Sequence, residues 1–222
     1  MTTPAITLGS VSRRILGVLL EKEFTTPNQY PLSVNSLTLG ANQKSNRHPI
    51  MSLDEYEVAD RLKALGKEGW VANRHEVGGR VEKWDHKVAE RLGLARAELA
   101  VLTELLLRGA QQPGELRSRA SRMHAFPNLE ELEKALRTLV EKGYARLLPR
   151  RPGERAARYD HAFYQEGEAP AAEEAPPAAE PPRAEPERPA PNTPGLEARL
   201  ARVEEELALI KARLESLEGR LP

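Results

Sequence analysis

The sequence contains no cysteine, and this absence excludes several chemistries at once. A chain without thiols has no disulfide, no cysteine nucleophile and no cysteine-ligated zinc or iron–sulfur cluster, which is typical of cytosolic proteins. The first eight residues lack the basic segment and apolar run of a signal peptide, and the apolar stretch ILGVLL at 15–20 is far shorter than the roughly 20 residues of a membrane helix. We therefore expect a cytoplasmic protein that does not span a membrane.

Sequence motifs of common enzymes are also missing. The chain has no G-x-S-x-G, G-x-G-x-x-G or G-x-x-x-x-G-K-[ST] segment, and its five histidines (48, 75, 86, 124 and 161) show no metal-ligand spacing. We therefore expect no catalysis, no cofactor and no metal site, and the sequence indicates no small-molecule substrate.

Charge is unevenly distributed along the chain, although the formal net charge is zero. Residues 87–165 carry 15 Lys/Arg against 10 Asp/Glu, whereas residues 166–222 carry 7 against 13. A basic middle and an acidic tail fit a polyanion-binding module with an acidic appendage. They fit a solvated surface with a solubilising tail almost as well.

Composition divides the chain near Gln165. Residues 165–194 hold nine of the eighteen prolines and no large apolar residue, which predicts a disordered linker. Residues 195–222 carry an apolar stripe that alternates spacings of four and three, as in a coiled coil. The stripe consists of Leu196, Leu200, Val203, Leu207, Ile210, Leu214, Leu217 and Leu221. We expect this segment to join copies of the chain into a homo-oligomer.

The part before the linker repeats itself. Residues 53–86 resemble residues 129–161: Leu62, Leu65 and Gly69 match Leu136, Leu139 and Gly143 at an offset of 74. Trp84-Asp85-His86 matches Tyr159-Asp160-His161 at an offset of 75, so the second loop is about one residue longer. Two copies of one unit of roughly 80 residues explain this pattern.

Each copy has the same expected order of elements. Helical spacing runs through Leu8–Leu19 and Leu94–Leu105, and shorter second helices are expected at 33–42 and 113–123. Third helices are expected to begin at capping boxes, Ser52 with Glu55 and Asn128 with Glu131, the first flanked by a hydrophobic staple of Met51 and Tyr56. Helix ends at Gly69 and Gly143 precede candidate hairpins that turn at Gly78-Gly79 and Pro152-Gly153.

Three helices followed by a hairpin is the order of a winged helix-turn-helix. The sequence therefore predicts a mainly α protein with small β-hairpins, built from two tandem winged helix-turn-helix domains at 8–88 and 93–164. The linker at 165–194 and a coiled coil at 195–222 complete the predicted organisation.

The chain also resembles the bacterial YceH family of tandem winged-helix proteins. The resemblance is carried by RRILGVLLEKEFTTPNQYPLSVNSLTLGANQKSNRHPIM, ELAVLTELLLRGAQQPGELRSR and the WDH and YDH ends of the two hairpins, and it covers residues 8–164. It implies the fold and supplies no established activity.

Basic and amide side chains gather where a winged helix approaches nucleic acid, namely the turn before the third helix and the hairpin or wing. The candidate contact residues for DNA or a partner are Lys44, Ser45, Asn46, Arg47, Arg74, Arg80, Arg117, Arg119, Arg150, Arg151 and Arg155. The third helices, however, begin with acidic residues, and these side chains would repel the phosphates of DNA. A protein-interaction scaffold that uses the third helices as partner surfaces therefore stays open beside DNA binding.

Two features could serve either structure or function: a contact surface is favoured for the segment 41–50, and a structural role for two equivalent histidines. The segment ANQKSNRHPI at 41–50 could be a contact surface or a polar connection between two helices. His86 and His161 occupy equivalent places in the two copies, where a hydrogen bond between hairpin and helix is the more common role.

Overall fold

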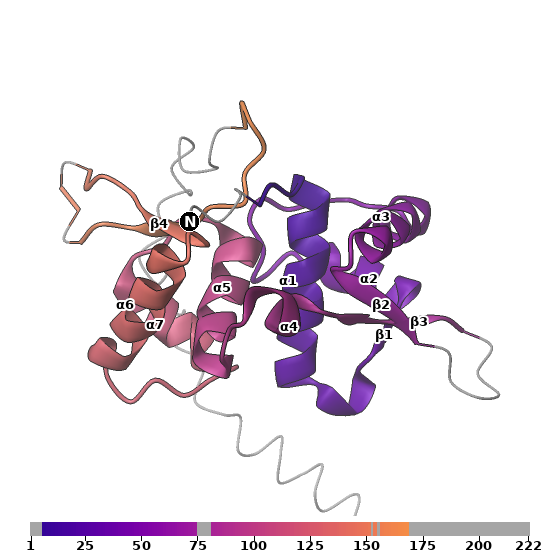
Figure 1. The fold of residues 1–222 in the computed structure, drawn as a ribbon, viewed down its shortest axis with the longest axis horizontal. Helices are drawn as coiled ribbons and strands as arrows, with labels where there is room; N and C mark the ends of the chain where they lie inside the picture. The colour runs from indigo at the N-terminus through magenta and orange to yellow at the C-terminus, as the bar shows by residue number, and fades with distance from the viewer. Residues whose placement is uncertain (1–5, 75–80, 152, 155, 169–222) are drawn as a thin grey trace, which may run out of the picture. The chain divides into compact units, whose positions relative to one another are not determined.

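The computed structural model describes residues 6–74, 81–151, 153–154 and 156–168, which all belong to one compact unit (Figure 1). This part of the chain is mainly helical and carries two small antiparallel sheets, as the sequence predicts. The predicted coiled coil and the linker beyond Glu168 lie outside the described residues, as do Arg80, Arg155 and the glycine pair of the first hairpin. Among the helices described, none has the length and apolar character needed to cross a bilayer.

The first repeat contains three α-helices and a three-stranded sheet. Its elements are α1 (Ser10–Thr25), the 3₁₀ turn η1 (Pro27–Gln29), β1 (Leu32–Ser33), α2 (Val34–Ala41), α3 (Glu55–Lys67), β2 (Val71–Arg74) and β3 (Lys83–His86). The central strand β3 pairs with β2 in the register Val71↔His86 and with β1 in the register Leu32↔Trp84. The hairpin expected after the third helix is therefore confirmed, and it gains β1 as a third strand.

The second repeat has the same order after one additional helix. Its elements are α4 (Val88–Leu92), α5 (Arg96–Arg108), α6 (Pro113–Ala120), α7 (Leu129–Glu141), β4 (Ala145–Leu147) and β5 (Tyr159–His161). The short α4, which the sequence analysis did not expect, connects the repeats and buries Val88 and Leu92. An isolated bridge between Gln111 and Tyr159 occupies the place that β1 has in the first repeat.

The helix ends show where local sequence was sufficient. Asn128 caps α7 by accepting a hydrogen bond from the Glu131 amide, as predicted. The prediction for α3 was wrong by two residues, because the capping box is formed by Asp54 and Glu57. The predicted staple of Met51 and Tyr56 is also wrong, because the side chain of Tyr56 is 81% exposed.

Gly69 and Gly143 end the third helices with the same geometry. Both have a φ of +75°, the left-handed region in which only glycine is free of strain. The following amides of Trp70 and Tyr144 donate to the carbonyls of Leu65 and Leu139, which is the Schellman arrangement. Each helix end therefore turns the chain directly into its hairpin.

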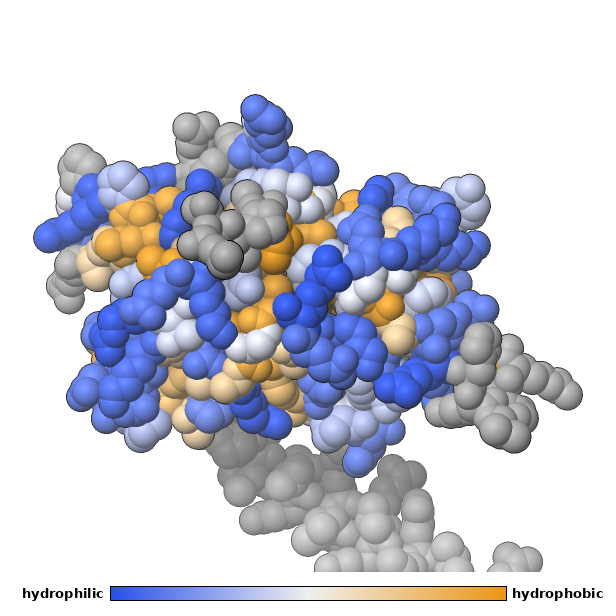
Figure 2. All heavy atoms as spheres, viewed as in Figure 1, coloured by the Kyte–Doolittle hydropathy of each residue, from blue (hydrophilic) through white to orange (hydrophobic). Residues whose placement is uncertain are grey.

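The two repeats share one hydrophobic core. Helices α1 and α5 lie side by side at the centre of the unit (Figure 1), and the approach is so close that a Cβ on Gly17 would stand 2.8 Å from Cδ2 of Leu107. Backbone hydrogen bonds cross between the repeats from Leu8 to Phe163 and from His48 to Leu107. The face drawn in Figure 2 is mostly hydrophilic with small apolar areas between the charged side chains.

Candidate functional site

The segment 41–50, one of the predicted contact regions, lies between the repeats. Arg47 is 5% exposed and forms a two-point ion pair with Glu21 of α1, with distances of 2.5 Å from Nη2 to Oε2 and 3.1 Å from Nη1 to Oε1. Its Nε donates to the carbonyl of Gly40 at 2.9 Å. The backbone of Asn46 is left-handed (φ 61°), which asparagine tolerates better than most residues. Of the four predicted contact residues here, Lys44 and Ser45 are exposed.

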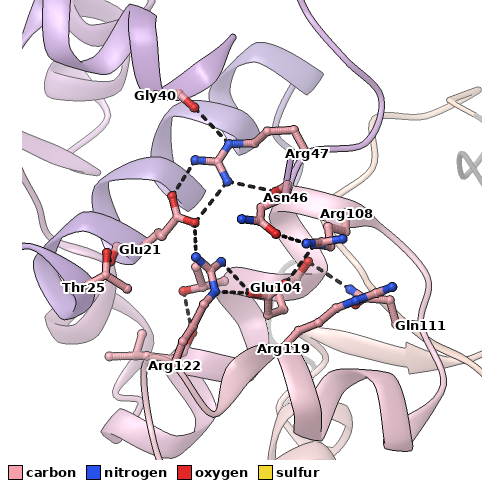
Figure 3. Close-up of polar contacts among 12 residues, drawn as sticks. Glu21, Thr25, Gly40, Asn46, Arg47, Glu104, Arg108, Gln111, Arg119 and Arg122 are labelled. Carbon is pink, nitrogen blue, oxygen red and sulfur yellow. Dashed lines mark hydrogen bonds and ion pairs between the residues drawn. The ribbon is translucent and has the colours of Figure 1, made fainter. Parts of the chain in front are cut away.

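Arg47 is one member of a polar network that connects the repeats (Figure 3). Glu21 also accepts from Arg122, at 2.6 Å from Nη1 to Oε1, and Arg122 donates from Nη2 to Glu104 of α5 at 2.7 Å. Arg108 lies with Nε 3.3 Å from the other carboxylate oxygen of Glu104, and its Nη2 donates to the side chain of Asn46. The contacts therefore close a ring through both repeats, because Asn46 and Arg47 are neighbours in the chain.

The charges in this ring stabilise one another. Burial raises the pKa of the Glu21 carboxyl, but the hydrogen bonds and charges of Arg47 and Arg122 outweigh burial, so the pKa is lowered. Burial lowers the pKa of Arg122, but Glu104 and then Glu21 more than offset this, so the pKa is raised. Burial lowers the pKa of Arg108, with Glu104 acting in the opposite direction. The Glu21 carboxylate is therefore held ionised at neutral pH.

Several of the other predicted contact cations also have partners within the chain. Arg74 lies with Nε 2.7 Å from Oδ2 of Asp85 on the neighbouring strand. Arg117 donates to the carbonyls of Phe126 and Pro127 and thereby secures the loop before α7. Arg119 donates to the side chain of Gln111 at 2.6 Å. These side chains are only partly available to an external ligand.

The second hairpin keeps its cations nearer to solvent. Arg150 is exposed and donates from Nε to the carbonyl of Glu154, and Arg151 is half-buried. Leu147 at the base of the hairpin is 55% exposed. Among the described residues, the predicted contact cations that are exposed are Lys44, Arg74 and Arg150.

The two equivalent histidines have different surroundings. The Nε2 atom of His86 lies 2.8 Å from a carboxylate oxygen of Glu23 on α1, which joins the first hairpin to the first helix. His161 is buried, its Nδ1 accepts from the amide of Phe163 at 3.3 Å, and burial lowers its pKa to about 3. The expected structural hydrogen bond is therefore present for His86, whereas His161 is a neutral histidine inside the second repeat.

Three large apolar residues in the stretch from α2 to α3 are exposed. Leu39 of α2 is 66% exposed, Ile50 of the connecting loop 64% and Tyr56 of α3 81%. Asn35 of α2 donates to Glu55 at the start of α3 at 2.7 Å, which connects the two helices at this surface. We call the three residues Leu39, Ile50 and Tyr56 the apolar triad. Sequence reasoning assigned Tyr56 to a hydrophobic staple and did not single out Leu39 or Ile50.

Acidic residues surround Tyr56 on the same helix. Asp54, Glu55, Glu57 and Asp60 are exposed, and in the second repeat Glu130 is exposed at the start of α7. Acids at a helix N-terminus stabilise the helix through its macrodipole. The structure therefore leaves the acidic character of the third helices facing solvent, as the sequence suggested.

Sequence reasoning missed the buried carboxylates of the ring. Glu21 follows ILGVLL, and Glu104 stands inside VLTELLL, so each is an acid within an apolar helical stretch. A buried carboxylate needs a paired cation, so the sequence could have predicted that each of these acids lies beside an arginine or lysine. The identity of the partners, Arg47 and Arg122, was not readable, because they come from other elements.

Comparison with known proteins places the chain in a family. A family model described as "Protein of unknown function, DUF480" matches residues 8–154. A UPF0502 protein of Enterobacter sp. (strain 638) is 42% identical over 223 residues, covering 96% of this chain and 97% of the relative. The UPF0502 protein YceH of Salmonella newport (strain SL254) is 39% identical over 221 residues with the same coverage, and a UPF0502 protein of Geotalea daltonii is 48% identical over 176 residues, covering 78% and 80%. The chain therefore belongs to the DUF480 family of UPF0502 proteins, which includes YceH, and the resemblance seen in the sequence is confirmed.

Proposed function

We propose that this chain is a non-enzymatic binding protein with two tandem winged helix-turn-helix domains, and that the first domain binds a protein partner through its α2–α3 face. The observation that carries the proposal is the apolar triad, since three large apolar side chains stand exposed on one helix-turn-helix. Exposed aromatic and large aliphatic residues are more typical of the centre of a protein interface than of an ordinary surface.

Charge on this face argues against DNA as its ligand. In a winged helix the start of the third helix approaches the phosphates. Here that position carries the exposed Asp54, Glu55 and Glu57, and the nearby Arg47 is neutralised by Glu21. Exposed cations lie in the preceding loop (Lys44) and later in α3 (Arg61 and Lys63). At the start of α3 itself, where phosphates would come closest, a polyanion meets the three acids, whereas a basic protein surface would be attracted to them.

The same charges define the chemistry of the partner. A complementary surface needs an apolar centre to cover Tyr56 and Leu39 and lysine or arginine at its rim to face the acids of α3. A short amphipathic segment with basic flanks meets both requirements.

A photo-cross-linking experiment tests this proposal. The full chain carrying p-benzoylphenylalanine in place of Tyr56 is irradiated in cell lysate, with and without nuclease. We expect a discrete protein adduct that survives nuclease and disappears when Leu39→Asp is added, because a charge at Leu39 disrupts the apolar centre. The matched control places the same probe at Arg137, which is exposed on the equivalent helix α7. Equal adducts at both positions, or adducts lost with nuclease, would contradict the proposal.

The second hairpin favours DNA binding as a second candidate function. Arg150 and Arg151 extend from a domain whose segment of the chain is net basic. If DNA binds here, replacing Arg150, Arg151 and Arg155 by alanine removes up to three phosphate contacts, so the slope of log K against log salt falls by up to about three. Wild-type affinity and slope in the triple variant would remove this hairpin from any DNA interface.

A further inference from the structure

A pocket of about 220 Å³ lies where the two repeats meet, on the side of α1 that carries Arg13 and Arg14. The first repeat contributes these arginines together with His48 and Met51, and the second contributes Leu106 and Tyr164 among others. The polar ring described above is a separate set of residues, none of which lines this pocket. The lining therefore combines two guanidinium groups with apolar and aromatic walls.

The arginines give the pocket a positive charge that the chain only partly neutralises. Arg14 is 1% exposed and donates to the carbonyls of Ala41 and Pro49, at 2.8 and 2.5 Å, but its Nε has no hydrogen-bond partner among the described residues. No carboxylate is paired with Arg14 in this part of the chain. A buried, unpaired guanidinium next to a pocket favours an anion there.

A carboxylate of the chain itself already occupies part of this pocket. Glu168 is held by the guanidinium of Arg13 at two points, with 2.7 Å from Nη1 to Oε2 and a second contact from Nη2 to Oε1. The side chain of Glu168 is 28% exposed, compared with 7% for Arg13. A carboxylate that binds this fork and is itself partly open to solvent can be exchanged for another carboxylate.

The wall next to Arg13 is aromatic. The centroid of the Tyr164 ring lies 4.7 Å from Cζ of Arg13 and 5.0 Å from Cζ of Arg146, and His161 stacks on the ring at 4.1 Å. The amide of Phe163 donates to Nδ1 of His161, so in the neutral imidazole the proton is on Nε2. For size, an engineered apolar cavity of about 150 Å³ holds benzene, so this pocket has room for a ring and a carboxylate.

We infer that this pocket binds a small organic carboxylate of about the size of benzoate, which displaces Glu168 from Arg13. The carboxylate takes the two donors of the Arg13 fork, and the apolar part packs beside Met51 and Leu106. The pocket shares no residue with the apolar triad, and its lining residues Pro49 and Met51 flank Ile50 in the chain.

Titration calorimetry on the full chain with sodium benzoate tests the inference, with benzamide at matched ionic strength as the uncharged control. We expect one benzoate site and no measurable binding of benzamide. Glu168→Gln removes the competing carboxylate and should tighten benzoate binding roughly fivefold, because the binding-competent state is then populated more fully. Glu166→Gln makes the same charge change at an exposed position two residues away and should leave the affinity unchanged.

Arg13→Lys keeps the charge but loses the planar fork, so benzoate affinity should fall at least about tenfold. A melting curve of each variant verifies folding, and the gain expected for Glu168→Gln cannot arise from unfolding. The inference is overturned if Glu168→Gln binds benzoate no better than Glu166→Gln. It is also overturned if benzamide binds as tightly as benzoate, or if Arg13→Lys leaves the affinity intact.

Discussion

Glu21 and Arg47 form a buried ion pair whose side chains are 2% and 0% exposed, and they come from the first helix and from the loop that follows the second. This pair explains the composition of the segment ANQKSNRHPI. Arg47 neutralises a carboxylate that α1 brings into the core, and Asn46 accepts from Arg108 of the second repeat. Two of the polar residues in this loop, Asn46 and Arg47, therefore help to connect the two repeats.

Removing one partner of this pair should destabilise the protein strongly. Arg47→Met leaves the Glu21 carboxylate buried with Arg122 as its only cation among the described residues, and breaking a buried pair in this way costs about 3–5 kcal/mol. Urea unfolding followed by circular dichroism measures the change. Lys44→Glu, an exposed position in the same loop, should stay within about 0.5 kcal/mol of wild type.

A double variant separates lost pairing from lost packing. Glu21→Leu with Arg47→Met replaces both charges with apolar groups while Arg122 keeps Glu104 as a partner. Its loss of stability should be smaller than the sum of the two single losses, because no charge is then left unpaired. Strictly additive losses would show that the two side chains do not depend on each other.

Local sequence was sufficient to predict the repeats, the order of elements and the core faces of the third helices. Leu62, Leu65, Leu136 and Leu139 are buried at equivalent places, because the helical period fixes which residues share a face. Gly69 was predictable as a helix end for a different reason: glycine is the residue that best suits the left-handed backbone that ends many helices.

The remaining features depend on contacts between distant parts of the chain. Ser52 and Asp54 are both good caps by propensity, and the local sequence did not distinguish them. The hydrogen bonds between Asn42 and Leu53 hold the preceding loop in place, and the helix begins after Asp54. Likewise, nothing near Arg47 in the sequence indicates that Glu21 lies beside it. A charged residue in a loop is normally expected to be exposed, but Arg47 is buried because it pairs with a buried acid from another helix.

Truncation of a core leucine tests the shared fold of the two repeats. Leu65→Ala and Leu139→Ala each remove a side chain that is at most 1% exposed, so each should cost about 2–5 kcal/mol. Leu39→Ala, at a leucine that is 66% exposed, should change stability by less than about 0.5 kcal/mol. Because the repeats share one core, we expect each core variant to unfold in a single transition. Two separate transitions would show that the repeats fold independently.

The tail of the chain carries a prediction that rests on sequence alone, since residues 195–222 lie outside the described residues. In the heptad with Leu200 and Leu207 at a positions, parallel pairing places opposite charges together in three g–e pairs, Arg199–Glu204, Glu206–Lys211 and Arg213–Glu218. The chain has no cysteine, so a single cysteine added after Pro222 should oxidise to a dimer in high yield. Efficient cross-linking only between Gly195→Cys and a cysteine after Pro222 would show antiparallel pairing instead.

The buried histidine of the second repeat should make stability depend on pH. Burial lowers the pKa of His161 to about 3, whereas an unfolded histidine titrates near 6.5. Between these pH values the imidazole of His161 is protonated in the unfolded chain but neutral in the folded chain. The free energy of unfolding is therefore unaffected by His161 above about pH 6.5 and decreases as the pH falls below it. Down to pH 5 the loss should reach about 2 kcal/mol, since one proton corresponds to about 1.4 kcal/mol per pH unit.

Two other buried groups define the window for this measurement. The pKa of Glu21 is lowered from the ordinary glutamate value of 4.5. The ionised carboxylate therefore stabilises the fold throughout the range from pH 5.0 to 7.5, and this stabilisation is lost only at lower pH. Burial raises the pKa of Asp160, so its protonation in the folded state opposes the effect of His161 in acid. Urea unfolding at pH 7.5 and 5.0 for wild type and His161→Asn isolates the histidine, because the asparagine does not titrate and can accept from the amide of Phe163. The difference between the two pH values should be about 2 kcal/mol smaller in the variant, and an equal difference in both proteins would assign the pH dependence to other groups.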